Sequence, residues 1–207
     1  MTPFARKLIV VLGTAAVAGC ATVAADTDYR QAALDLLKQD FRSKGPATLD
    51  RVIAQDEAQQ LCSQYPQERP AEVSARIEAA QMKNIRQPAD GKYTGSWQEG
   101  EKIAQNGRGM QSSDQAGGVN GGNCYACHQI TKKEISFGNI GPSLYQYGKI
   151  RGNSEEMLKY TWGKIYNAQA YTACSNMPRF GHNGILTEAQ IKDVMALLLD
   201  PASPVNQ

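Results

Sequence analysis

The stretch Gly122-Asn123-Cys124-Tyr125-Ala126-Cys127-His128 decides the fold of this chain of 207 residues. In a Cys-x-x-Cys-His motif the two thiols add across the vinyl groups of a haem, and the turn between them brings the next imidazole to the iron. The motif therefore predicts one covalently bound haem c on Cys124 and Cys127, with His128 as an axial ligand. Half of a zinc site and a thioredoxin-like redox pair are the alternatives, but the former needs more cysteines or histidines at matching spacing and the latter a βαβ setting.

The second axial ligand is expected from a methionine or from the other histidine. The candidates are Met82, Met110, Met157, Met177, Met195 and His182. Met157 and Met195 fall in helical patterns, where core packing is the commoner role. Met177 precedes Pro178 in an irregular stretch just before the last helix, where small c-type cytochromes bring a loop across the haem. We predict Met177 as the ligand, and His182 is the alternative.

The loop after the motif contains Gly138-Asn139-Ile140-Gly141-Pro142. A carbonyl in such a loop often accepts a hydrogen bond from Nδ1 of the haem-bound histidine and fixes the orientation of its ring. We assign this supporting role to Pro142, which could otherwise be only a turn residue.

Ligation by histidine and methionine would leave the iron with no open position. A thioether also raises the reduction potential of a haem. This combination predicts electron transfer rather than catalysis at iron, and the chain offers no catalytic residues of its own. A gas-binding or sensor haem would require Met177 to be absent from the iron or labile.

The five cysteines are Cys20, Cys62, Cys124, Cys127 and Cys174. Two belong to the haem motif and Cys20 lies in the N-terminal segment, which leaves Cys62 and Cys174. In an oxidising compartment two remaining cysteines most simply form a disulfide. A free, functional thiol at one of them is the alternative.

Residues 1–25 have the pattern of a secretory signal peptide. Arg6 and Lys7 precede an apolar stretch from Leu8 to Ala18, which is shorter than the roughly 20 residues of a membrane-spanning helix. The small residues before Asp26 favour cleavage after Ala25. A lipobox ending at Cys20 is the alternative, and it would give a lipid-anchored protein. We therefore expect a periplasmic location, with a membrane partner only if Cys20 is lipidated.

The charge of the chain gives no reason to expect nucleic acid as a partner. Two of its 22 basic residues, Arg6 and Lys7, lie in the expected signal, so that the remainder has 20 basic and 20 acidic residues. Two haem propionates would make this balanced chain mildly negative.

Helical periodicity throughout predicts an all-α fold with two parts, a helical extension over 26–91 and a haem domain over 92–207. The first expected helix ends near Gly45-Pro46. Further helices are expected over 48–62, 70–85, 96–105 and 155–168, and the last one follows the capping box at Thr187.

Several segments of the second part together resemble the SoxX family, small cytochrome subunits of the SoxAX complexes of sulfur-oxidising bacteria. They are the haem motif, Gly138 to Leu144, Arg151-Gly152, Cys174-Ser175-Asn176-Met177-Pro178-Arg179-Phe180-Gly181 and Leu199 to Asn206. The resemblance covers the chain from Ser96 to its end, and the segment around Met177 is its most specific part.

This resemblance implies an electron-transfer subunit of a SoxAX-type L-cysteine S-thiosulfotransferase. Its SoxA-like haem partner would join thiosulfate oxidatively to a cysteine of the carrier SoxYZ, and this chain would pass the electrons to a soluble cytochrome c. The substrate site is then expected on the partner. A free-standing periplasmic electron shuttle is the alternative, although the balanced charge and the extra helical part fit a stable complex better.

Overall fold

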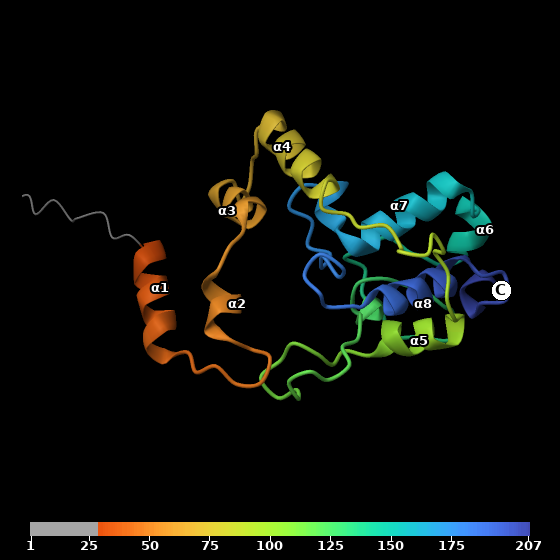
Figure 1. Cartoon of the computed structure of the whole chain (residues 1–207), viewed down its shortest axis with the longest axis horizontal. Helices are drawn as coiled ribbons and strands as arrows, with labels where there is room; N and C mark the ends of the chain where they lie inside the picture. The colour runs from red at the N-terminus through yellow and green to blue at the C-terminus, as the bar shows by residue number, and fades with distance from the viewer. Residues whose placement is uncertain (1–28) are drawn as a thin grey trace, which may run out of the picture.

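The computed structural model describes residues 29–207, and within that range the chain folds into helices joined by long irregular segments (Figure 1). The α-helices are α1 (Tyr29–Asp40), α2 (Leu49–Ile53), α3 (Glu57–Gln64), α4 (Ala71–Met82), α5 (Trp97–Gln105), α6 (Tyr147–Arg151), α7 (Glu155–Tyr166) and α8 (Glu188–Leu199). Short 3-10 turns are η1 (Cys124–Ala126), η2 (Ala168–Ala170) and η3 (Pro204–Asn206). The described residues contain no β-strand, which confirms the all-α prediction.

The main core lies where α5 and α7 pack against α8. The largest completely buried side chains there include Trp162 of α7 and Ile191, Met195 and Leu197 of α8. Helix α5 approaches α8 most closely at Gly100, where any Cβ would collide with the backbone of α8. Helix α8 begins at the predicted capping box, in which the side chains of Thr187 and Gln190 each accept a hydrogen bond from the other's backbone N–H. This core forms the framework of the candidate site.

The helix expected over 48–62 is two helices, α2 and α3, and this part of the prediction was wrong. Asp56 interrupts it because this residue is the N-cap of α3 and has an extended backbone. Its side chain accepts from the N–H of Gln59 at 2.9 Å, and its own N–H donates to the Gln59 side chain at 3.0 Å. The short helix α6 was not predicted.

A second, smaller core joins the N-terminal extension to the rest of the chain. Ala58 of α3, Ile77 of α4 and Ala173 are buried together. Beside them a disulfide joins Cys62 of α3 to Cys174, with their Cα atoms 5.6 Å apart. The pairing expected from the cysteine count is therefore present, and it attaches the extension to the segment that follows η2.

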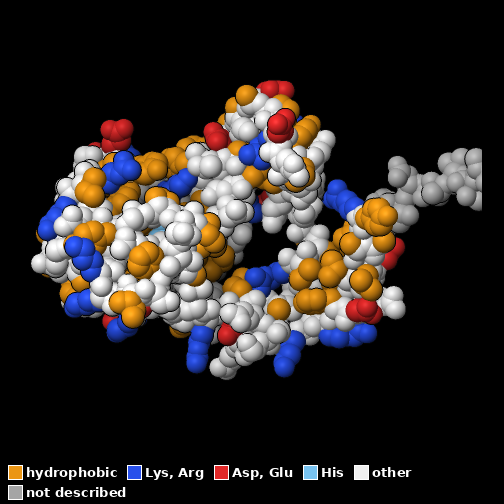
Figure 2. Space-filling model, turned by 180° about the vertical axis from the view of Figure 1, so that it is seen from behind, with side chains coloured by type: hydrophobic (Ala, Val, Ile, Leu, Met, Phe, Trp, Pro, Cys, Tyr) orange, Lys and Arg blue, Asp and Glu red, His pale blue; other side chains and the backbone are white. Residues whose placement is uncertain are grey.

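Helices α1 and α2 form an arm with no buried residue. The arm meets the rest of the chain through Arg51, which donates to the carbonyl of Met110 at 3.2 Å in the loop 106–123. Figure 2 shows an opening between this arm and the body of the molecule. No helix within residues 29–207 is long and apolar enough to cross a membrane. The expected signal peptide and Cys20 lie outside the described residues, and the boundary between residues 91 and 92 stays a prediction.

Candidate functional site

The Cys-x-x-Cys-His motif forms a single tight turn. Asn123 has the left-handed backbone conformation, φ 46°, which asparagine tolerates better than most residues, and the 3-10 turn η1 follows at once. The N–H groups of Cys127 and His128 both donate to the carbonyl of Cys124, at 3.1 and 2.9 Å. The two cysteines and the histidine are thereby held within one compact turn, from which Cys124 and His128 line the cavity described below, and neither cysteine forms a disulfide.

Tyr125, between the two cysteines, anchors this turn to α5. Its ring is buried, and its hydroxyl lies 3.1 Å from both the Thr131 hydroxyl and a Glu101 carboxylate oxygen. Burial raises the pKa of the Tyr125 phenol, and the Glu101 carboxylate raises it further. The phenol therefore stays protonated and can donate to Glu101, which fixes the motif against a helix of the main core.

The imidazole of His128 is held by the loop that follows the motif. Its Nδ1 lies 2.7 Å from the carbonyl oxygen of Pro142, where the sequence placed this supporting contact. Gly141 donates its N–H to the carbonyl of Cys127 at 2.9 Å, and its Cα lies so close to the ring that an added Cβ would collide with it. These contacts leave Nε2 as the ring nitrogen that can bind a metal.

An apolar cavity lies between this turn, α5, α7 and α8. The volume of this cavity is about 410 Å³, and part of this volume is open to solvent. Its lining consists of Ala104, Cys124, His128, Ile130, Leu144, Ile165, Met177, Phe180, Leu186, Val194, Leu197 and Leu198. Burial raises the pKa of the Cys124 thiol to about 12. The cavity is lined mainly by hydrocarbon, with the imidazole and the thioether as its two strong ligands.

The other ligand candidates are elsewhere. Met195 is completely buried in the main core, and Met82 at the end of α4 is 43% exposed. The Met157 sulfur lies 3.8 Å from the Tyr147 hydroxyl, and the Met110 sulfur is 3.8 Å from the Asn120 amide. None of these four lines the cavity.

His182, the alternative ligand, does not line the cavity either. Its Nε2 lies 3.9 Å from the carboxylate of Asp56. Burial and the neighbouring guanidinium of Arg179 lower the pKa of His182, although Asp56 opposes this. The structure thus brings Met177 and His128 to one cavity and places His182 in a polar cluster outside it.

That polar cluster is the part of the site region that the sequence did not reveal. It contains Arg179, which is 5% exposed, together with Asp56 of α3 and Gln81 of α4. Two signals were present in the sequence, the capping box that begins at Asp56 and an arginine two residues after Met177. Neither could show that the two meet, because they are more than a hundred positions apart.

The residues present fit haem c. Two unpaired thiols flank one tight turn, the neighbouring imidazole has its Nδ1 satisfied by a carbonyl, and the cavity beside them is apolar. This donor set would bind a flat, hydrophobic, iron-containing group through two thioether links and one nitrogen.

Comparisons with known proteins agree with this chemistry. Residues 98–200 match the family described as Cytochrome c. The chain is also 39% identical over 167 residues to a protein of Aquifex aeolicus (strain VF5) named "Uncharacterized lipoprotein", covering 80% of this chain and 79% of that one. This alignment is longer than the chain from position 98 to its end, so the similarity extends into the helical extension.

Proposed function

We propose that this chain is an exported electron carrier with His128 and Met177 as the axial ligands of its haem. The chain belongs to the same family as the Aquifex aeolicus protein and contains a cytochrome c domain. Such a domain carries covalently bound haem c. The observation that carries this proposal is that both side chains line one apolar cavity beside Cys124. When bound, the haem supplies one reversible electron, taken up or released by its iron.

The protein residues around the cavity set the conditions for that transfer. The carbonyl of Pro142 lies within hydrogen-bond distance of His128 Nδ1 and so fixes the orientation of the imidazole. The thioether of Met177 and the hydrocarbon lining both favour a positive potential, because the lining excludes water and the thioether stabilises the ferrous state. If His128 and Met177 both bind the iron, no position would be left on it for substrates or oxygen.

We further propose that the chain is the electron-accepting subunit of a SoxAX-type complex, in which a SoxA-like partner binds the sulfur substrate. The resemblance of the segments around the motif and around Met177 to SoxX supports this assignment. Exposed apolar side chains also suit a stable partner. Ile135 is 91% exposed and Ile140 75%, in the loop whose N–H groups at Gly138 and Gly141 bond to the motif's backbone.

We also propose that Cys20 is lipidated. The sequence favoured cleavage after Ala25, but the relative that this chain resembles over most of its length is named as a lipoprotein. A Cys20→Ser variant should be released from membranes while the natural chain stays with them, as measured by fractionating cells. Release of both chains would contradict lipidation and support cleavage after Ala25.

The axial ligand is tested by replacing Met177 with alanine in the holoprotein. The ferric absorption band that marks methionine–iron ligation should disappear, and the reduction potential should fall by on the order of 100 mV, within the roughly 0.8 V range set by axial ligands. Met82→Ala is the matched control, since Met82 is exposed at the end of α4. If the band survives in the Met177 variant and is lost in His182→Ala, the alternative ligand is the correct one.

The partner is tested by affinity purification of the tagged chain from cells grown on thiosulfate. A second haem protein should co-purify, and thiosulfate together with the SoxYZ-like carrier should reduce the haem of the complex. A strictly monomeric chain whose haem stays oxidised would contradict the SoxAX-type assignment and favour a free-standing shuttle.

A further inference from the structure

We propose that helices α3 and α4 of the extension hold the segment that carries Met177, and that Arg179 is the positioning residue for this ligand. The inference rests on the proposed ligation by Met177 and gives the extension a role in it. Segment 173–182 contains no helix of its own. Contacts with other elements must therefore fix its position. The extension supplies them on both sides of Met177, and the carbonyl of Tyr166 in α7 also accepts from the N–H groups of Gly181 and His182.

The first anchor precedes Met177. The N–H of Ala173 donates to the Glu78 carboxylate of α4 at 2.9 Å, and its carbonyl accepts from Arg69 at 3.2 Å. The next residue, Cys174, is bonded covalently to Cys62 of α3. Both backbone polar groups of one residue and the side chain of its neighbour are thus satisfied by the extension.

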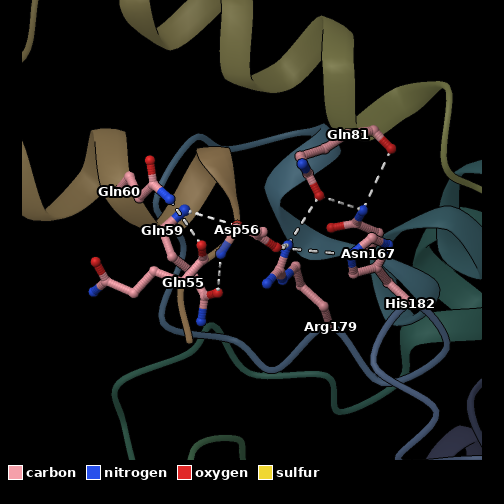
Figure 3. Close-up of polar contacts among 8 residues, drawn as sticks. All are labelled: Gln55, Asp56, Gln59, Gln60, Gln81, Asn167, Arg179 and His182. Atoms are coloured by element: carbon pink, nitrogen blue, oxygen red, sulfur yellow. Dashed lines mark hydrogen bonds and ion pairs between the residues drawn. The ribbon is translucent and has the colours of Figure 1, made fainter. Parts of the chain in front are cut away.

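The second anchor follows Met177 and centres on Arg179. Figure 3 shows its guanidinium between Asp56 and Gln81. Its Nη1 lies 2.7 Å from Asp56 Oδ2 and 3.1 Å from Gln81 Oε1. The amide of Asn167 donates to the same Gln81 oxygen at 2.9 Å, so Gln81 is itself held in place. Two helices of the extension therefore converge on one buried side chain.

The charges make this second anchor specific. Burial alone would raise the pKa of Asp56, but the backbone N–H of Gln59 and the guanidinium of Arg179 outweigh it and hold the pKa below its usual value. The carboxylate is therefore ionised at neutral pH. A guanidinium that is 5% exposed requires such a counter-charge, because a buried charge left without its partner is strongly unfavourable.

Met177 lies three residues after the first anchor and two residues before the second. Loosening either anchor frees the backbone around Met177, while the main core, which includes Phe180 at the far end of this segment, stays folded. The expected consequence is a larger population of protein in which the sixth position of the iron is open.

Carbon monoxide binding to the reduced holoprotein measures that population. In Asp56→Asn the charge is lost, while the shape and the helix cap are kept, because asparagine caps helices as well as aspartate. The rate of carbon monoxide binding should rise about tenfold, in proportion to the open fraction. The matched control is Glu57→Gln at the first residue of α3, because the ion pair of Glu57 with Arg76 of α4 is exposed and does not involve segment 173–182. The rate in this control should stay within about twofold.

The remaining outcomes separate the two proposals. If Asp56→Asn does not accumulate, Arg179→Lys replaces it, keeping the charge but not the planar fork, and a smaller rise is expected. If Met177→Ala binds carbon monoxide rapidly while neither anchor variant differs from Glu57→Gln, the ligand stands and the positioning role is overturned. If Met177→Ala behaves as the natural chain does, the ligand assignment itself fails. A pair that is only structural would lower the melting temperature and leave the rate unchanged.

Discussion

The His128 side of the cavity and the Met177 side are held by contacts of very different range. On the first side, the bond from His128 to Pro142 spans 14 positions and the bond from Tyr125 to Glu101 spans 24. On the second side, the bond from Arg179 to Gln81 spans 98 positions and the disulfide 112. The side chain of His128 is held by contacts of short range, and the segment that contains Met177 is held by contacts of long range with the extension.

Because of this difference, the contacts on one side of the cavity can be lost while those on the other side persist. Local contacts re-form whenever the motif and its loop are intact, whereas the long-range contacts depend on α3 and α4 staying docked. We therefore expect the Met177 side to open at lower denaturant than the His128 side. Three predictions follow from this comparison, beginning with the change that should widen it most.

Replacing both Cys62 and Cys174 by serine should weaken the Met177 side most. Removing a cross-link over a loop of this length should lower the free energy of unfolding by about 4 kcal/mol. A urea titration of the holoprotein, followed by the methionine–iron band and by circular dichroism, should show the band lost before the helices. Coincident loss of both signals would mean that the two sides do not open separately.

Gly141→Ala should damage the His128 side instead. The added Cβ would collide with the imidazole of His128, and overpacking of this kind costs about 1–3 kcal/mol. Less haem should be attached during expression, and the reduction potential should shift because the ring must turn away from Pro142. Gly107→Ala is the control, since a Cβ there makes only ordinary contacts. Equal haem content in the two variants would show that the ring tolerates displacement.

The smallest effect concerns pH. The pKa of His182 lies below its ordinary value of 6.5, because burial and the nearby guanidinium disfavour its charged form. The unfolded chain then takes up a proton more readily, so stability is full above pH 6.5 and declines as the pH falls through this value toward the folded pKa. The loss should be small, since the group is partly exposed to solvent.

Replacing His182 by asparagine should remove this part of the acid sensitivity, as measured by urea unfolding at pH 7.5 and pH 5.5. The only other histidine of the chain is His128, the proposed iron ligand. An unchanged pH dependence in the variant would show that the imidazole of His182 is not responsible for the decline.

The same contrast of range explains what could be predicted from the sequence. Three features could be predicted because each depends on a short stretch whose residue types dictate its geometry. They are the motif, the Pro142 contact and the capped helix α8. The Met177 assignment used position along the chain, and the structure places this residue on the cavity. The Arg179 cluster could not be predicted, because no local pattern records which distant carboxylate will meet a buried guanidinium.

Helix boundaries followed the same rule. The capping box at Thr187 was predicted from the sequence and is present. The break at Asp56 was missed because apolar residues on both sides of it kept a helical spacing. Its capping box was the local signal that outweighed this periodicity.

The position of the disulfide along the chain also bears on the order in which the protein matures. Cys62 and Cys174 enclose both motif cysteines, so an exported chain that emerges from its N-terminus offers Cys62 two wrong partners, Cys124 and Cys127, before the right one. A disulfide formed in order of emergence would block haem attachment and would have to be reshuffled. Early attachment of the haem would convert both competitors to thioethers and leave Cys174 as the one thiol within residues 29–207 with which Cys62 can pair. Attachment of the haem would thus also prevent Cys62 from forming a disulfide with the wrong cysteine.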